Sequence, residues 1–259
     1  MRALLYILMD YLNNAFKKDT NYFIALILAT NISKIPAWTL DQAAAHCNVS
    51  KATLNRFCKE LGYQNYTRLR FIASLDDEKD YELYDAEYRR QKLEAISKTL
   101  ATVNSIDDGV FKRIGKLVME SDEVFFCGYG KYLNCALKAQ IDLMIHKKMS
   151  TARIDFIRQV ESIRESSCDK GLVICVSMGG RSVAGFGLRE AISSKGFQSV
   201  LITRSHNEEL LAPYDAVIDM GEDYGFRSGT YGVDYVMERI TNAFYTELKE
   251  RNIWRSGGR

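Results

Sequence analysis

The sequence lacks the features that mark membrane and secreted proteins. No apolar run approaches the roughly 20 residues that a membrane-spanning helix needs. The N-terminal stretch MRALLYILMDYL is apolar, but Asp10 interrupts it and no small-residue cleavage site follows, so it predicts a helix rather than a signal peptide. Only two prolines occur in 259 residues, and the composition is that of an ordinary globular chain. We therefore expect a cytoplasmic protein without membrane contact.

Paired cysteines are also missing. The chain has six cysteines, but they are far apart and none belongs to a C-x-x-C pair. Several lie in apolar runs, where cysteine behaves as a small hydrophobic residue, so we expect reduced thiols. Together with the histidines they show no metal-ligand spacing, and no metal site is predicted. The GYGKYL segment lacks the third glycine of a dinucleotide-binding fingerprint, so we predict no cofactor. The cysteines are Cys47, Cys58, Cys127, Cys135, Cys168 and Cys175.

Net charge is small, at +2, but the charges are unevenly distributed. Residues 1–75 contain nine Lys and Arg against four Asp and Glu. Such an excess suits a surface that faces phosphates. The rest of the chain is slightly acidic, as a ligand-binding or oligomerisation domain can be.

A helix-turn-helix is predicted in the basic part of the chain. Thr39 and Gln42 have the spacing of a capping box, which opens the short helix LDQAAAHC. Asn48 ends it, because asparagine tolerates the left-handed conformation of a sharp turn. Ser50 is a favourable N-cap for the next helix, and Gly62 supplies its C-terminal stop. The apolar residues of this second helix recur at helical spacing and are Leu54, Phe57, Cys58 and Leu61.

The opposite face of that second helix carries hydrogen-bond donors, which suits the major groove of DNA. We predict base contacts from Lys51, Asn55 and Arg56. Lys59 is predicted to contact phosphate, together with Arg68 and Arg70 downstream. The predicted DNA-binding set is Ser50, Lys51, Thr53, Asn55, Arg56, Lys59, Arg68 and Arg70.

Two further helices precede this motif and one follows it. Apolar residues from Leu4 to Phe16 and from Phe23 to Leu28 have helical spacing, and Asp19-Thr20 can cap the second run. We expect both to be scaffold, although the first helix is apolar enough to be a dimer contact. The segment QNYTRLRFIAS predicts the third helix, with Tyr63 and Tyr66 packing rather than stacking on bases.

The composition changes at Asp76. The segment DDEKDYELYDAEYRRQK is dense in charge and has no Gly or Pro, which predicts a solvated helical linker. An amphipathic helix follows, and Asp107 begins another. We therefore divide the chain into a DNA-binding domain at 1–75, a linker at 76–104 and a second domain at 105–259. The apolar residues of these two helices are Leu93, Ile96, Leu100 and Val103, then Phe111, Ile114, Leu117 and Val118.

The second domain alternates apolar strands with helices. This pattern predicts an α/β fold with a parallel sheet and helices on both faces. Ligands of such sheets lie beyond the carboxyl ends of the strands. Strands are predicted at Glu123–Gly130, Ser150–Asp155, Gly171–Ser177, Ser199–Ser205 and Asp215–Gly221. Helices are predicted between them, among them one over Val183–Gly196, and a last helix over Gly232–Leu248.

Two strand-to-helix loops have the composition of an anion site. The loop CVSMGGRSVAG offers the hydroxyls of Ser177 and Ser182, and small residues that let backbone N–H groups approach an anion at a helix N-terminus. The loop CGYGKYLN follows its own strand in the same way. Together the two loops predict one anion-binding site, and their glycines are Gly128, Gly130, Gly179 and Gly180.

These motifs resemble a known family. The segment VSKATLNRFCKELGYQNYTRLR is similar to the helix-turn-helix of RpiR-type bacterial transcriptional regulators. The segment LVICVSMGGRS, followed by a helix and SVLITRS, resembles the sugar-isomerase (SIS) domain that those regulators carry downstream. The resemblance covers nearly the whole chain. It implies an all-α helix-turn-helix domain joined to an α/β SIS domain, in a homodimer or homotetramer that binds a palindromic operator in double-stranded DNA.

The resemblance also implies that the SIS domain binds a phosphosugar without turning it over, so that the protein regulates carbohydrate metabolism genes. Ser177, Gly180 and Ser182 match the phosphate loop of the family, whereas Gly179 stands where that loop has a second hydroxyl residue. Lys131 and Tyr132 stand where the family has small hydroxyl residues. Two alternatives follow: the Tyr132 side chain fills the space of the ligand, or Lys131 supplies a positive charge to its phosphate. The implied effector-binding residues are Gly128, Tyr129, Gly130, Lys131, Tyr132, Ser177, Gly179, Gly180, Ser182 and Glu222, with Asp155, Arg227 and Ser228 near other family positions.

Two alternatives stay open. An SIS domain can be an aldose–ketose isomerase, which needs a general base, or it can serve oligomerisation alone. His146 and His206 are predicted to be surface histidines, and Glu161 and Glu190 fit ordinary helix faces. We therefore predict a regulator that is not an enzyme and has no catalytic residues.

Overall fold

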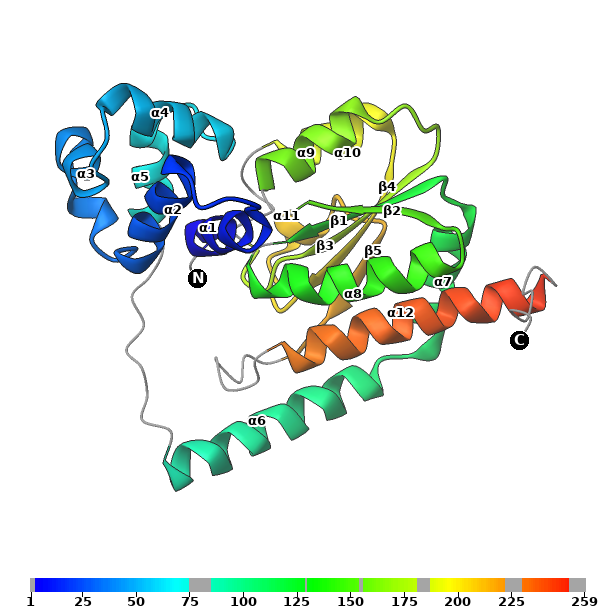
Figure 1. The fold of residues 1–259 in the computed structure, drawn as a ribbon. Coiled ribbons are helices and arrows are strands. Elements are labelled where there is room, and N and C mark those ends of the chain that lie inside the picture. Colours follow the sequence, from blue (N-terminus) through cyan, green and yellow to red (C-terminus); the bar gives the residue numbers. More distant parts are fainter. Residues whose placement is uncertain are drawn as a thin grey trace, which may run out of the picture. The chain divides into compact units, whose positions relative to one another are not determined.

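The computed structural model describes residues 3–74, 85–128, 130–153, 156–180, 187–221 and 230–251. The chain divides into two compact units, Met1–Tyr81 and Glu82–Arg259 (Figure 1). Within the described ranges, no helix combines the length and the apolar character that crossing a membrane requires. All six cysteines are free thiols, and five of them are buried. Burial raises the pKa of Cys175 to about 12, which keeps this thiol protonated near neutrality.

The first unit is all helical. Its predicted caps are present, because Asp19 accepts a hydrogen bond from the Tyr22 N–H and Thr39 forms a capping box with Gln42. Leu54 and Phe57 are fully buried among the helices. The elements are α1 (Ala3–Asn14), α2 (Thr20–Thr30), a 3-10 turn η1 (Ile35–Ala37), α3 (Leu40–His46), α4 (Lys51–Glu60) and α5 (Tyr66–Ser74).

Two phenylalanines of this unit are less buried than the helical pattern predicted. Phe16 was assigned to the first helix, but α1 ends at Asn14 and the Phe16 side chain is fully exposed. Phe23 lies on the outer side of α2 and is 50% exposed. The apolar run of α2 is wider than the stripe that one helix buries in a small unit, so part of it faces outward.

The second unit has the predicted α/β architecture. Five parallel strands form one sheet in the order β2-β1-β3-β4-β5. All six residues of β3 are buried, as expected of a parallel strand covered on both faces. The strands are β1 (Glu123–Gly128), β2 (Met149–Ala152), β3 (Gly171–Val176), β4 (Gln198–Thr203) and β5 (Ala216–Asp219).

Helices cover both faces of this sheet (Figure 1). Alternate residues of β1 point to opposite sides, since Phe126 joins the hydrophobic cluster of α7, α8 and α12, and Phe125 joins that of α9, α10 and α11. The fold-class prediction is therefore confirmed. The helices are α7 (Asp108–Glu120), α8 (Lys131–Ile145), α9 (Phe156–Glu165), α10 (Leu188–Lys195), α11 (Glu208–Leu211) and α12 (Tyr231–Glu250).

Helix α10 starts later than the sequence predicted. Gly187 precedes it in the left-handed conformation, with a φ of 72°, and the helix begins at Leu188. The predicted start at Val183 lies outside the described residues. A left-handed residue cannot continue an α-helix, so α10 is not continuous with the glycine loop after β3.

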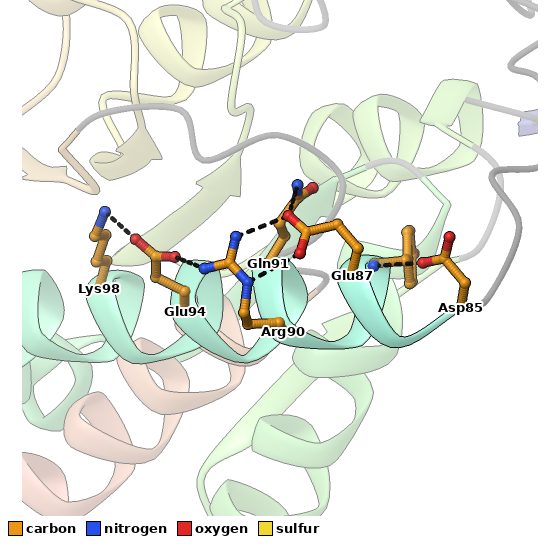
Figure 2. Close-up of polar contacts among 7 residues, drawn as sticks. Asp85, Glu87, Arg90, Gln91, Glu94 and Lys98 are labelled. Carbon is orange, nitrogen blue, oxygen red and sulfur yellow. Dashed lines mark hydrogen bonds and ion pairs between the residues drawn. The ribbon is translucent and has the colours of Figure 1, made fainter.

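The end of the charged segment, from Ala86 on, begins helix α6 (Ala86–Ser105), which lies in the second unit. Residues 76–84 lie outside the described residues, and the linker at 76–104 stays a prediction. Asp85 caps α6 by accepting a hydrogen bond from the Tyr88 N–H at 2.7 Å. Its outer face carries a chain of ion pairs, in which Arg90 contacts Glu87 and Glu94, and Glu94 contacts Lys98 (Figure 2). These pairs at helical i,i+3 and i,i+4 spacing support the helix.

The buried face of α6 is Ala95, Thr99 and Val103. The predicted face included Leu93, which is instead 67% exposed. Small residues occupy the contact because α6 packs closely on α12: a Cβ added to Gly232 would lie 2.5 Å from the Thr99 Cγ2. Close approach of the two helices therefore selects small side chains over leucine at this face.

Arg239 of α12 binds the segment that connects α6 to α7. Its guanidinium donates to the Val103 carbonyl at 2.5 Å and to the Ile106 carbonyl at 3.0 Å, and it pairs with Asp108. It also lies over the Phe111 ring, 3.8 Å from the centroid. This partly buried cation therefore adds donors to carbonyls at the end of α6, beside the Ile106 N–H that also donates to Val103.

Candidate nucleic-acid interface and candidate effector site

The turn between α3 and α4 has the predicted geometry. Asn48 has a φ of 57°, and the Val49 N–H donates to the Ala44 carbonyl at 3.0 Å. Ser50 then caps α4, its Oγ accepting from the Thr53 N–H at 3.1 Å. The two hydroxyls of these residues are also 2.9 Å apart. Helix α4 therefore starts at a fixed point after α3, as a helix-turn-helix requires.

Two polar side chains of α4 hold this helix in its unit. Asn55 Oδ1 accepts a hydrogen bond from the Tyr66 N–H at 2.9 Å, at the start of α5. Glu60 accepts from Asn21 at 2.8 Å and from Tyr11 at 3.3 Å. The bond to Tyr66 occupies the side-chain oxygen of Asn55 at the start of α5, and the predicted base contact of Asn55 stays a prediction.

The cations of α4 lie on its outer face. Lys51, Arg56 and Lys59 are all exposed. Lys51 pairs with Asp41 of α3 at 2.8 Å, and the hydrogen bond that it donates to this carboxylate raises the pKa of Lys51 above its ordinary value. Arg56 and Lys59 thus lie on one exposed helical surface with a third cation near its N-terminus.

The predicted phosphate contacts of α5 already make contacts within the unit. The Arg70 guanidinium donates to the Trp38 carbonyl at 3.4 Å, and Arg68 lies over the Phe71 ring at 5.2 Å. Tyr63 and Tyr66 are buried, which confirms that they pack. Burial also raises the pKa of Tyr66 to about 12.

The second candidate site lies where the strand order reverses. Helix α8 connects β1 to β2 on one side of it, and α9 then connects β2 to β3 on the other side of β1, so the carboxyl ends of β1 and β3 flank the switch point of the sheet. Gly128 ends β1 opposite Val176 of β3, and Val176 lies opposite Ile202 of β4. The loops after β1, β3 and β4 therefore emerge side by side, as the sequence predicted for an anion site.

A buried glutamine holds the end of β1. Gln159 of α9 is 1% exposed, and its amide accepts from the Gly128 N–H at 3.0 Å and donates to the Gly128 carbonyl at 2.9 Å. It also donates to the Arg153 carbonyl at 2.6 Å. The N–H of Gly128 is therefore engaged within the unit, and the predicted place of Gly128 in the effector site stays a prediction.

Helix α8 begins at the first loop. Gly130 is buried and has φ 55° and ψ −130°, a conformation that only glycine adopts readily. Lys131 and Tyr132 form the first turn of α8 and are half-buried, with the Lys131 Nζ 5.4 Å from the Tyr132 ring centroid. Tyr132 packs against the hydrophobic cluster of α7, α8 and α12.

The loop after β3 is a tight turn. The Gly180 N–H donates to the Ser177 carbonyl at 3.1 Å, and Gly180 has a φ of 73°. The Ser177 N–H continues the sheet by donating to the Ile202 carbonyl at 3.0 Å, and Ser177 is 4% exposed. Gly179 is exposed, and a Cβ added there would meet nothing within 4 Å.

Of the remaining residues named from the sequence, some lie within the described part of the chain and the others lie outside it. His206 lies at the carboxyl edge of the sheet, where its Nδ1 is 3.7 Å from the Asp219 Oδ2, and it is exposed as predicted. His146 is instead half-buried, with its ring edge-on to Tyr245 at 4.7 Å. Glu161 and Glu190 are exposed. Tyr129, Asp155, Ser182, Glu222, Arg227 and Ser228 lie outside the described residues.

Sequence reasoning missed two residues at these sites, Gln159 and Arg204, and the contact of Asn55 with α5. The partners of Asn55 and Gln159 lie 11 and 31 positions away, and no local motif predicts such pairs. Arg204 follows β4 directly, and its N–H donates to the Met178 carbonyl of the glycine loop at 3.1 Å. Its position immediately after an apolar strand was the signal that could have found it. Among the described residues, no group of three His, Cys, Asp or Glu side chains could hold a metal ion.

Comparisons with known proteins agree with both units. Residues 8–79 match the family model for the helix-turn-helix domain of the rpiR family. None of the curated proteins compared with the chain matches it. The NanR protein of Vibrio vulnificus, solved in complex with ManNAc-6P, has 18% sequence identity over 96% of this chain and 94% of that chain, with a TM-score of 0.55. The sugar isomerase domain of the RpiR transcription factor from Sphaerobacter thermophilus has 16% identity over 66% of this chain and 95% of that chain, with a TM-score of 0.50. Identities this low establish a likeness of fold.

Proposed function

The N-terminal unit is an rpiR-family helix-turn-helix domain joined to an α/β unit of the SIS fold, and from this premise we propose that the chain is a DNA-binding transcriptional regulator. We further propose that it controls carbohydrate metabolism genes in response to a phosphosugar. In this proposal the chain acts as a homo-oligomer on a palindromic operator, and it binds the sugar phosphate without converting it.

The observation that carries the proposal is the exposed cationic face of α4. The capped turn after α3 fixes where α4 begins. Arg56 and Lys59 then lie on the exposed face of α4, away from its buried residues. Recognition helices of this class place the N-terminal part of the second helix in the major groove. Arg56 can make a bidentate contact with guanine, while Lys51 and Thr53 lie one turn nearer the N-terminus.

Phosphate contacts are assigned to Lys59, Arg68 and Arg70. These cations belong to α4 and α5, and they account for the basic excess of residues 1–75. Such contacts position the domain on DNA and add affinity without sequence preference. Because one helix-turn-helix reads one half-site, a palindromic operator matches a two-fold dimer.

The effector arm of the proposal rests on the second unit. Its glycine loop lies at the switch point of a parallel sheet, where ligands of this architecture bind. NanR of Vibrio vulnificus shares the fold and was solved with ManNAc-6P, which makes this compound a rational first probe. The residues assigned to the effector are those predicted from the sequence, with the contribution of Gly128 limited by its bond to Gln159.

DNA binding can be tested by selecting preferred sequences from a random duplex pool with the purified protein. The wild type is expected to enrich a palindrome. Arg56→Ala should lose preference at one base pair per half-site, with a loss of about 1 to 3 kcal/mol in discrimination. Lys17→Ala, an exposed cation between α1 and α2, is the matched control and should keep the preference. Enrichment of no sequence by the wild type would contradict the proposal.

The effector arm is tested separately by thermal unfolding with ManNAc-6P, other hexose and pentose phosphates, and the unphosphorylated sugars. A ligand at about 100 times its dissociation constant adds about 2.7 kcal/mol to native stability, which raises the melting temperature visibly. A shift with a phosphosugar, but not with its parent sugar, supports phosphosugar sensing. No shift with any of them would leave oligomerisation as the task of this unit.

A further inference from the structure

Main-chain donors at the carboxyl edge of the sheet are largely engaged. The Gly128 N–H donates to Gln159, the Ser177 N–H to Ile202 and the Gly180 N–H to Ser177. The hydroxyl that the resemblance places at position 179 is replaced by a glycine. In the first turn of α8 the Leu133 N–H also donates, to the Gly130 carbonyl at 3.0 Å, so an anion bound here depends mainly on side chains for charge and hydrogen bonds.

Arg204 follows β4 directly and contacts the glycine loop through its backbone. Its N–H donates to the Met178 carbonyl at 3.1 Å. The preceding Thr203 is 1% exposed, and its hydroxyl donates to the Ser177 carbonyl at 2.7 Å. The Ser205 N–H donates back to the Thr203 Oγ1 at 3.0 Å. These hydrogen bonds join the end of β4 to the loop after β3. They fix the backbone of Arg204 directly beside that loop.

The Arg204 side chain is half-buried, with its Nε shielded from solvent. Half-buried guanidinium groups are suited to anions because arginine stays charged and is more weakly hydrated than lysine. Its planar fork matches the oxygens of a phosphate with two parallel hydrogen bonds. Lys131, on the far side of the loop, lies instead over the Tyr132 ring.

We propose that Arg204 supplies the principal charge for the phosphate group of the effector, in place of the hydroxyl that Gly179 lacks. This inference rests on the proposed function, since it assigns the residue that selects phosphosugars over uncharged sugars at the same site. Arg204 then makes the fork contact, the Ser177–Gly180 turn lies beneath the phosphate, and the sugar lies along the carboxyl edge towards β1.

The test is calorimetric titration of the full chain with ManNAc-6P, with inorganic phosphate and with unphosphorylated ManNAc. Arg204→Gln removes the charge, and Arg204→Lys keeps the charge but loses the fork. Lys170→Gln is the matched control, because Lys170 is exposed and precedes β3 at the opposite edge of the same sheet. Operator binding without ligand reports that each variant is folded.

We expect Arg204→Gln to weaken binding of both phosphate probes by about 10- to 100-fold, since a charged hydrogen-bonded pair is lost. Arg204→Lys should fall between this variant and the wild type, and Lys170→Gln should bind as the wild type does. Equal binding by Arg204→Gln and the wild type overturns the inference, and so does an equal loss in Lys170→Gln. If Arg204→Gln does not fold, wild-type affinity in Arg204→Lys overturns it.

The failure of the proposed function gives a different result. If the wild type itself binds neither phosphate probe, the effector arm fails and the role of Arg204 fails with it. If the wild type binds them and Arg204→Gln binds them equally well, the effector arm stands and only the role of Arg204 is lost.

Discussion

The two candidate sites are built from different parts of the chain. The DNA-facing surface of the first unit consists of side chains on helix α4, and its outer cations Arg56 and Lys59 are exposed. The candidate effector site of the second unit consists of loop backbone at strand ends, and several of its N–H groups already have partners. A helical face shows its chemistry in the sequence, whereas a loop shows it only once its hydrogen bonds are known.

The stability of the two units follows the same division. In the first unit, single polar ties such as Asn55 to Tyr66 join neighbouring helices. In the second unit, one cation, Arg239, joins α12 to the junction of α6 and α7 with several bonds. Substitutions in the second unit are therefore expected to have the larger effects.

The largest effect is expected from Arg239→Ala. The carbonyls of Val103 and Ile106 lose the guanidinium donor and Asp108 loses its ion pair, so the free energy of unfolding should fall by about 3 kcal/mol. Lys112→Ala is the control: Lys112 is 57% exposed and pairs with the similarly exposed Glu250 at 3.9 Å, so the loss should stay below about 1 kcal/mol. Urea unfolding measures both. Equal losses would mean that Arg239 is no more than a surface ion pair.

Glycine substitutions in the loop after β3 should give the next largest effect. Gly180→Ala places a methyl 2.7 Å from the Leu210 Cδ2 at a positive φ, so stability should fall by about 1 to 3 kcal/mol. Gly179→Ala meets no atom within 4 Å and should change stability by less than about 0.5 kcal/mol. Thermal unfolding of the two variants compares them directly. A larger loss in Gly179→Ala would contradict the geometry of this turn.

A smaller effect distinguishes two neighbouring residues of α4. Asn55→Ala removes the cap of α5 and should reduce stability by about 1 kcal/mol. The Arg56 side chain is exposed, so Arg56→Ala should change stability by less than about 0.5 kcal/mol. The same variant should lose base discrimination. Denaturant unfolding and operator titration separate these outcomes. If Asn55→Ala keeps full stability yet loses base preference, Asn55 acts as a base contact rather than as the cap of α5.

The smallest effect is expected from Asp41→Asn. The carboxylate pairs with Lys51 at 2.8 Å, so its removal frees this lysine and takes one negative charge from the DNA-facing unit. DNA affinity should rise, and the logarithmic salt slope should steepen by about 0.9 if Lys51 gains one phosphate. Asp10→Asn is the matched control, because it removes one carboxylate of the same unit that accepts from Asn14. An unchanged slope in Asp41→Asn would place Lys51 away from the phosphates.

Much of the fold could be predicted from the sequence because local signals and hydrophobic periodicity agreed. The caps at Asp19, Thr39 and Ser50 are present as predicted, and the five apolar runs are strands of one parallel sheet. Leu93 was misplaced because the face of α6 that packs on α12 is decided by how closely Thr99 approaches Gly232. That approach depends on residues more than 100 positions apart, which no local pattern contains.

Less of the candidate sites could be predicted. Residue types placed Arg56 and Lys59 on the outer face of α4, since a helical period assigns each residue to one side. The engagement of Gly128 by Gln159, and the nearness of Arg204 to the glycine loop, depend on which strands are neighbours. Strand order follows from packing of the whole unit, so these contacts needed the structure.

The bonds of Arg239 also set an order of events during synthesis. Val103 leaves the ribosome first and Arg239 follows 136 residues later, which takes roughly 7 to 27 seconds at about 5 to 20 residues per second. During that interval the helix-turn-helix is already complete, whereas α6 and α7 wait for their partner. A chain that stops before Tyr231 therefore leaves the apolar faces of α6 and α7 exposed to water. Quality-control proteases of the cell recognise and degrade chains with such exposed faces.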